Sequence, residues 1–163
     1  RDVERSRGLG DVYKRQVQRP APVTTAVWHR KVEILLISES DIIFQQTQRI
    51  LEEQKKLSLF SFEDIEETDN LQYDIIIIDF DQLRVCKKDF KIILDIRCRS
   101  NIPILALLEK SSISDQFEVL SIGALDFLER PVTDEVYSGK LEQLYQWKWY
   151  YDWEKNMYEN TIS

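Results

Sequence analysis

The sequence predicts an α/β fold in which a parallel sheet of five strands carries helices on both faces. Short apolar runs rich in branched residues alternate with amphipathic segments, and this alternation occurs five times along the chain. One run, Ile75 to Ile78, places four consecutive isoleucines between carboxylates, which is typical of a central parallel strand buried on both faces. Strictly alternating strands and helices predict a parallel sheet with right-handed crossovers.

The first half of the chain predicts two strands, each followed by a helix. Residues 31 to 37 (KVEILLI) form the first strand, and the polar residues after it suit the start of a helix. Residues 41 to 54 carry one apolar stripe at helical spacing and therefore predict that helix. Residues 57 to 62 predict the second strand, and the acidic segment EDIEETDN after it predicts a short helix.

The middle of the chain repeats the pattern around the strongest strand. Residues 73 to 79 (YDIIIID) predict the third strand, and residues 102 to 108 (IPILALL) predict the fourth. Between them, apolar residues recur at helical spacing and predict a helix whose buried stripe is Cys86, Phe90, Ile93 and Leu94.

The last third of the chain predicts a capped helix, a fifth strand and a final helix. Ser112 with Asp115 three residues later resembles a capping box, and Gly123 is placed to end the helix that follows. Residues 125 to 128 predict the fifth strand. Thr133 is expected to cap the final helix, whose apolar stripe is Tyr137, Leu141, Leu144 and Tyr145.

Composition excludes several classes of protein. Twenty-nine acidic residues against twenty-two basic ones give a net charge of −7, which argues against a nucleic-acid-binding surface. No apolar run approaches the roughly 20 residues that span a bilayer, so we expect no membrane segment and a cytoplasmic location. A small-molecule enzyme or cofactor binder lacks support as well, because no glycine-rich phosphate loop and no histidine or cysteine constellation is present, and we expect no enzymatic activity.

The chain divides into three predicted parts. Residues 1 to 30 read as an adapter-like leader and a proline-containing linker, and we expect them to be disordered. Residues 31 to 146 form the α/β domain. Residues 147 to 163 form an aromatic-rich helical extension.

Polar residues at the predicted strand ends are the candidates for function, because open parallel sheets bind ligands at the carboxyl ends of their strands. Ser38, Glu39 and Asp41 follow the first strand, Asp79 and Asp81 lie at the end of the third, and Arg130 follows the fifth. A structural alternative stays open, in which Asp79 is a solvated strand terminus and Glu39, Asp81 and Arg130 form an ordinary ion-pair network.

Three segments resemble the receiver domains of response regulators. EILLISESD resembles the family's first strand and the loop after it, YDIIIIDFDQL its phosphoacceptor motif, and GALDFLERP its Gly-Ala to Lys-Pro segment. The resemblance covers residues 31 to 152 and implies a flavodoxin-like sheet with strand order 2-1-3-4-5 and helices on both faces.

The resemblance also implies a chemistry at the strand ends. Asp79 matches the aspartate that accepts a phosphoryl group, and Arg130 matches the lysine that contacts that group. The implied metal is Mg²⁺, held by Glu39, Asp79 and the main-chain carbonyl of Asp81, because carboxylate and phosphate repel each other until their charge is neutralised. The implied partner is a histidine kinase or a phosphotransfer protein.

Five positions depart from the family's pattern. Ser38 and Glu39 replace a pair of acidic residues, which predicts weakened metal binding because Mg²⁺ demands strict octahedral geometry. Arg130 keeps the positive charge of the lysine but has a broad planar fork. Leu108 replaces the serine or threonine whose hydroxyl couples the phosphoryl group to the switch, and Phe127 matches the switch aromatic without a hydroxyl.

Two functions follow from these residues. In the first, the chain is a receiver domain of a two-component phosphorelay that is phosphorylated on Asp79 and signals through protein–protein contacts. In the second, it is a pseudo-receiver that acts as an interaction or dimerisation module without phosphorylation. In either case, the extension with Trp147, Trp149 and Trp153 is predicted to contact a partner, a second copy or a covalently linked output domain.

Overall fold

The computed structural model describes residues 32–51, 55–80 and 87–162. The predicted leader, residues 1 to 30, lies outside this range. The described elements follow in strict strand–helix alternation: β1 (Val32–Ile37), α3 (Asp41–Ile50), β2 (Lys55–Phe60), α4 (Phe62–Glu66), β3 (Ile75–Asp79), α5 (Lys87–Arg99), β4 (Ile104–Glu109), α6 (Ile113–Ser121), β5 (Asp126–Arg130) and α7 (Asp134–Ile162).

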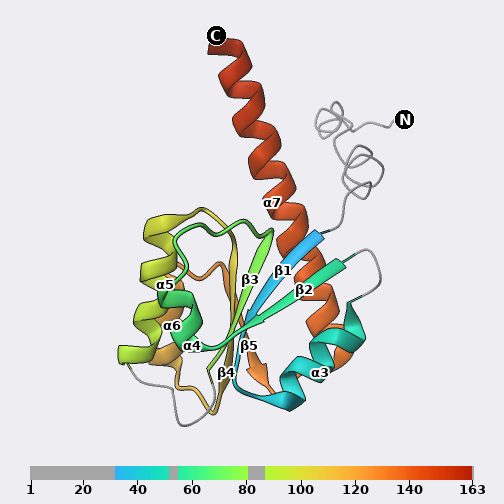
Figure 1. Ribbon diagram of the computed structural model, residues 1–163, viewed down its shortest axis with the longest axis vertical. Helices are drawn as coiled ribbons and strands as arrows, with labels where there is room; N and C mark the ends of the chain where they lie inside the picture. Colours follow the sequence, from blue (N-terminus) through green and yellow to red (C-terminus); the bar gives the residue numbers. More distant parts are fainter. Residues whose placement is uncertain (1–31, 52–54, 81–86, 163) are drawn as a thin grey trace, which may run out of the picture. The chain divides into compact units, whose positions relative to one another are not determined.

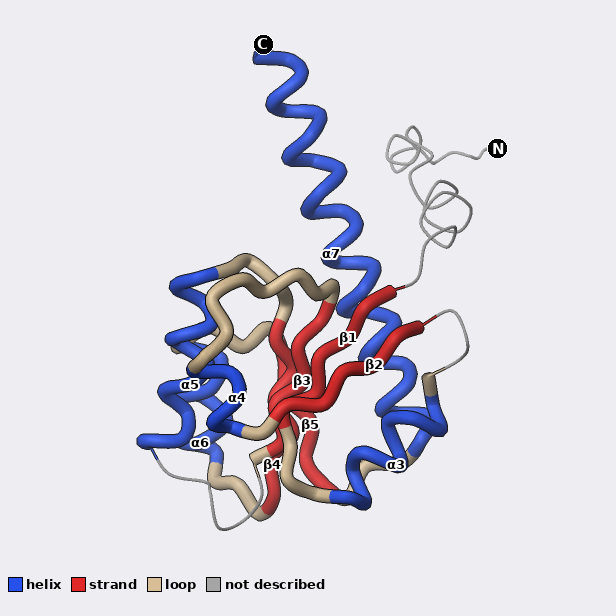
Figure 2. Tube along the Cα trace, viewed as in Figure 1, coloured by secondary structure: helices blue, strands red, loops and turns tan. Residues whose placement is uncertain are grey.

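The five strands form one parallel sheet in the order β2-β1-β3-β4-β5, which confirms the predicted topology. Helices α4, α5 and α6 lie on one side of this sheet, and α3 and α7 lie on the other (Figure 1). Figure 2 shows the same layers, with the strands as a twisted central band between the two groups of helices. The predicted flavodoxin-like arrangement is therefore present.

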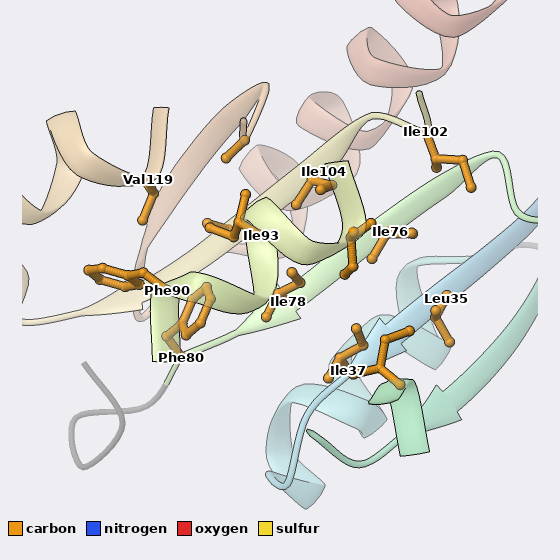
Figure 3. Packing of buried hydrophobic residues seen from close by; sticks show 14 of the residues in the cluster. Leu35, Ile37, Ile76, Ile78, Phe80, Phe90, Ile93, Ile102, Ile104 and Val119 are labelled. Atoms are coloured by element: carbon orange, nitrogen blue, oxygen red, sulfur yellow. The ribbon is translucent and has the colours of Figure 1, made fainter. Parts of the chain in front are cut away.

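The strand β3 is the centre of the core, as its run of isoleucines predicts. All five of its residues are buried, and β1 and β4 pair with it on either side. Phe80, directly after β3, packs edge-on against Phe90 of α5 with the ring centroids 5.1 Å apart. Figure 3 shows these two rings beneath Ile93 and beside Ile78, which belong to the same buried cluster. Because the sheet is covered on both faces, its central strands carry no polar face.

Side-chain caps begin several of the described helices. Ser112 and Asp115 form the predicted capping box of α6, in which each side chain bonds the other residue's backbone N–H. The hydroxyl of Thr133 accepts a hydrogen bond from the backbone N–H of Val136 at the start of α7, as predicted. Ser61 forms a further capping box at the start of α4. These caps satisfy N–H groups that lack partners in the first turn of a helix.

Several predicted boundaries and faces are wrong. The second strand was expected to run from 57 to 62, but β2 ends at Phe60 because the next residue, Ser61, caps α4. The first helix ends at Ile50 instead of 54. Leu94, expected on the buried stripe of α5, is 44% exposed, and Ile96 occupies the core instead. A helix turns about 100° per residue, so a buried face that recurs at every third residue, through Phe90, Ile93 and Ile96, drifts around the helix axis away from Leu94. Cys86, the first residue of the predicted stripe, lies outside the described residues.

The last helix, α7, is much longer than the domain needs. Its first half packs against the sheet through the predicted stripe of Tyr137, Leu141, Leu144 and Tyr145, all of them buried. Its second half continues past the sheet at the edge where β1 and β3 begin (Figure 1). None of the helices in the described part of the chain is long and apolar enough to cross a bilayer.

Candidate functional site at the carboxyl ends of the strands

The polar residues predicted from the strand ends meet at one edge of the sheet. Asp79 is the last residue of β3, Ser38 directly follows β1, and Arg130 is the last residue of β5. β1 is adjacent to β3, whereas β4 separates β3 from β5, so the side chain of Arg130 reaches across the end of β4. All these strands are parallel, and their carboxyl ends therefore share one edge.

The carboxylate of Asp79 is the buried centre of this edge. The residue is only 2% exposed, and a buried carboxylate needs partners that replace its lost hydration. Its Oδ2 accepts a hydrogen bond from Oγ of Ser38 at 2.7 Å, and its Oδ1 lies 3.2 Å from Nη1 of Arg130. A hydroxyl therefore contacts one carboxylate oxygen and a positive charge contacts the other.

The guanidinium of Arg130 connects the ends of three strands. Besides Asp79 on β3, it contacts Glu109 at the end of β4, where Nη2 donates to Oε1 at 2.8 Å. The arginine side chain is 13% exposed and that of Asp79 1%, so this ion pair is shielded from bulk water, whereas Glu109 is 35% exposed. An ammonium group could not present two separate nitrogen atoms in one plane to two carboxylates. Arginine at this position thus does more than keep a positive charge.

The hydroxyl of Ser38 is held in place by a second contact. Its Oγ accepts a hydrogen bond from the backbone N–H of Ser40 at 3.0 Å, and the residue is 5% exposed. Ser40 in turn caps α3, because its own Oγ accepts from the backbone N–H of Ile43. With its acceptor side used by Ser40, the single proton of Ser38 points at Asp79. Sequence reasoning treated Ser38 only as a lost metal ligand and missed this donor role, although the spacing Ser-Glu-Ser before a helix start was visible.

A second buried polar pair lies near the site and was also missed. Thr47 of α3 and Tyr137 of α7 have their hydroxyl oxygens 2.8 Å apart, and both residues are fully buried. Burial raises the pKa of the Tyr137 phenol far above its ordinary value, and the negative charge of Asp79 raises it further. Tyr137 therefore stays neutral at ordinary pH. In the sequence, it was recognised only as one member of the apolar stripe.

The remaining predicted site residues are spread over different environments. Leu108 is fully buried in β4 and belongs to the main core cluster, so it packs and offers no hydrogen bond. Phe127 is half-buried and packs against the same cluster. Glu39 is exposed. Asp81 lies outside the described residues, so the predicted contribution of its carbonyl is not addressed by the structure.

The described residues do not fit a magnesium site. No three histidine, cysteine, aspartate or glutamate side chains in the described part of the chain are grouped to hold a metal ion. Asp79, the central ligand expected, already contacts Ser38 and Arg130. Mg²⁺ would have to approach a carboxylate that faces a fixed guanidinium, with a hydroxyl in place of the usual second carboxylate. The predicted set of Glu39, Asp79 and Asp81 stays a prediction.

The predicted partner residues lie on the second half of α7. Trp147 stacks on Tyr151 with ring centroids 5.3 Å apart, and Trp149 stacks on Trp153 at 6.2 Å. These pairs are four residues apart, so they form two rows along the helix. Further along, the side chains of Met157 and Tyr158 are 50% and 69% exposed.

This aromatic half of α7 lies at the opposite edge of the sheet from Asp79. Arg97, near the end of α5, donates to the carbonyls of Ile102 and Gly123, which precede β4 and β5. Burial lowers the pKa of the Arg97 guanidinium, and the nearby Tyr151 acts in the opposite direction. Tyr151 is thus close to the amino ends of β4 and β5.

Comparison with known proteins finds response regulators among the curated proteins. No protein-family model matches the chain. The response regulator protein GraR of Staphylococcus epidermidis is 27% identical over 124 residues, which cover 71% of this chain and 52% of GraR. GraR of Staphylococcus aureus shows the same identity and coverage. The chain therefore spans about half the length of the curated relatives it matches.

Solved structures agree on the fold. The receiver domain of the Francisella response regulator 1452 has a TM-score of 0.59 at 20% identity, over 71% of this chain and 98% of that domain. A two-component response regulator from Clostridium difficile has a TM-score of 0.61 at 20% identity, covering 71% of this chain and 97% of the other. At such identities the likeness concerns the fold, while the sequence relationship comes from the GraR proteins.

Proposed function

We propose that this chain, a response-regulator receiver domain by its sequence relatives and its fold, is the regulatory module of a two-component phosphorelay and signals through protein–protein contacts. The observation that supports this is Asp79 at the end of β3, with Arg130 3.2 Å from its Oδ1. We further propose a histidine kinase or phosphotransfer protein as its partner, a cytoplasmic location, and a signalling role without enzymatic turnover.

In this proposal, Asp79 is the phosphoacceptor. One of its carboxylate oxygens attacks the phosphorus of a phosphohistidine, the bond from phosphorus to the histidine nitrogen breaks, and an acyl phosphate forms. Arg130 is already beside the carboxylate and would contact the added phosphoryl oxygens, which carry the new negative charge. The resulting change in charge next to Tyr137 and Glu109 would favour a different arrangement of α7 and of the end of β4.

The experiment is phosphorylation of the whole chain by acetyl phosphate with Mg²⁺, followed by intact-protein mass spectrometry. We expect a gain of one phosphoryl group in the wild type and none in Asp79→Asn. Asp126→Asn is a matched control, because Asp126 is a more exposed aspartate of the same sheet, and it should leave the gain unchanged. If no mass gain depends on Asp79, the phosphoacceptor proposal is wrong.

A specific observation favours a second function, that of a phosphorylation-independent pseudo-receiver. Ser38 and Arg130 already compensate Asp79, and Leu108 offers no hydroxyl to a phosphoryl group. In that case the fold would present its interaction surfaces constantly. Asp79→Asn would then leave partner binding and self-association as in the wild type, whereas a phosphorylated switch would show a difference between phosphorylated and unphosphorylated protein.

We propose that the aromatic half of α7 binds a second copy of this chain. Trp147, Trp149 and Trp153 lie there with further exposed apolar side chains, and aromatic residues are enriched in interface centres. Charge favours this partner: the chain has a net charge of −7, but residues 146–162 hold two lysines against three carboxylates. Two copies can thus meet along this nearly neutral segment with little like-charge repulsion.

Sedimentation velocity on the whole chain tests this partner. We expect a dimer for the wild type and a shift to monomer for Met157→Glu, since Met157 is 50% exposed in this half of α7. Ile42→Glu is the matched control because Ile42 is an exposed apolar residue of α3, and it should stay dimeric. A monomeric wild type, or equal loss in both variants, would contradict the proposal.

A further inference from the structure

The receiver relatives and the fold imply a cation at Asp79, and the described residues of this chain do not suit one. Two features carry this disagreement: the positive charge of Arg130 faces Oδ1 of Asp79, and the hydroxyl of Ser38 faces Oδ2. Both partners come from the protein itself. The charge compensation that a divalent ion would provide is thus present in the fold.

We propose that Ser38 and Arg130 make the Asp79 site independent of divalent cations, with Ser38 as the residue that determines this. The inference concerns the same site as the proposed function, but it rests only on the contacts of Asp79 and not on whether Asp79 is phosphorylated. A serine hydroxyl lacks the negative charge of the carboxylates that usually hold Mg²⁺, and here it has a role in place of the metal.

The geometry gives Ser38 this role because it is both buried and fixed. Oγ of Ser38 is 2.7 Å from Oδ2 of Asp79, a distance at which a carboxylate in its place would repel Asp79 strongly. A serine at this position removes the repulsion and adds a hydrogen bond to the charged form. If residue 38 were an aspartate, its carboxylate and that of Asp79 would need a cation between them.

Arg130 provides the charge itself. Its guanidinium is held from the other side by Glu109 at 2.8 Å, so it does not depend on a ligand for its position. An incoming cation would have to displace this guanidinium or share Asp79 with it, and like charges at that distance repel. The guanidinium of Arg130 therefore disfavours the binding of a Mg²⁺ ion at Asp79.

The test asks whether substitutions at this site, made in the whole chain, create a dependence of the melting temperature on Mg²⁺ that the wild type lacks. We expect the melting temperature of the wild type to be the same in EDTA and in millimolar Mg²⁺. Ser38→Asp should melt lower than the wild type in EDTA and recover on addition of Mg²⁺, because the metal would then join the two carboxylates. Mn²⁺ affinity measured by electron paramagnetic resonance should rise by about tenfold or more, in line with the sensitivity of metal sites to changes around them.

Ser61→Asp is the matched control, because Ser61 follows β2 at the same edge as Ser38 follows β1, and the change adds the same charge. It should show no response to Mg²⁺. Arg130→Met keeps the test decisive if Ser38→Asp does not fold, because removing the internal cation should make Mg²⁺ stabilise the protein.

Two results would overturn the inference. One is Mn²⁺ binding by the wild type that is lost in Asp79→Asn. The other is the absence of any Mg²⁺ response in both Ser38→Asp and Arg130→Met while they remain folded. Failure of the phosphorylation assay is a separate outcome, because it depends on mass gain and not on the metal response.

Discussion

The two ends of α7 carry the same kinds of side chain in opposite environments. Near its beginning, Tyr137 is fully buried, its hydroxyl is 2.8 Å from that of Thr47, and its pKa is raised by burial and further by the charge of Asp79. Near its end, Tyr158 is 69% exposed. A tyrosine thus stabilises the sheet at one end, whereas at the other it is available to a partner, and only the surroundings decide which.

This difference suggests how a change at Asp79 could reach the proposed dimer surface. Helix α7 spans 29 residues, about 43 Å at 1.5 Å per residue, and runs from the Asp79 edge of the sheet to the opposite edge and beyond. Its beginning is buried beside the site, and its end carries the aromatic rows and the exposed side chains of Met157 and Tyr158. Because α7 is one continuous helix, a displacement of its beginning would also displace its end.

The largest expected effect concerns the site. Arg130→Met should lower the free energy of unfolding by about 3–5 kcal/mol, because it leaves the buried charge of Asp79 without its ionic partner. Urea denaturation at neutral pH measures this loss. The double variant Asp79→Asn with Arg130→Met should recover most of it, since neither charge remains. A loss under about 1 kcal/mol in the single variant would mean that the pair contributes little.

The second prediction compares the two halves of α7 directly. Leu144→Ala should cost about 2–5 kcal/mol, because Leu144 is 4% exposed and its removal leaves a cavity against the sheet. Met157→Ala should stay within about 0.5 kcal/mol, because its side chain is half exposed. Both are measured by urea denaturation at a protein concentration low enough for monomers. Equal losses would show that the end of α7 packs against the domain as tightly as its beginning.

The third prediction isolates the buried phenol. Tyr137→Phe should cost about 1 kcal/mol, the usual contribution of one hydrogen bond, while Thr47 keeps its bond to the carbonyl of Ile43. Tyr158→Phe is the control with the same chemical change on an exposed ring, and its stability should equal that of the wild type. If both variants lose the same amount, the hydroxyl of Tyr137 has no special role.

The fold was predictable from the sequence because its signals are local. The isoleucine run of β3, the Ser112–Asp115 capping box and the stripe of α7 each determine one element, and alternation then implies a parallel sheet. Errors arose where neighbouring signals compete: Ser61 could extend a strand or cap a helix, and it caps α4.

The site was predictable only in part. Strand ends placed Asp79 and Arg130 at one edge, but their contact depends on the reach of a side chain across β4. The bond from Ser38 to Asp79 joins residues 41 positions apart, and the pair of Thr47 and Tyr137 joins residues 90 apart. Such pairs follow from strand register and helix rotation, which no local pattern determines.

The smallest expected effect concerns the first turn of α7, where the salt bridge is exposed. Hydrogen bonds from Arg49, and then from Gln46, lower the pKa of the Asp134 carboxyl from 3.8 to about 2. A group whose pKa is lower in the folded state contributes its stability above the unfolded pKa and loses it as the carboxyl is protonated. The contribution of Asp134 should therefore be complete above about pH 4 and disappear towards pH 2.

Asp134→Asn tests the contribution of this salt bridge to the stability of the start of α7. The difference in urea midpoint between wild type and variant should be small but constant from neutral pH to about pH 4, and should shrink as the pH falls towards 2. Added salt should reduce it at every pH, because Arg49 and Asp134 are 60% and 40% exposed and their interaction is screened. A difference that is the same at pH 2 and pH 7 would mean that Asp134 stabilises the start of α7 by packing and not by its charge, and the beginning of the helix would then be anchored to α3 independently of pH.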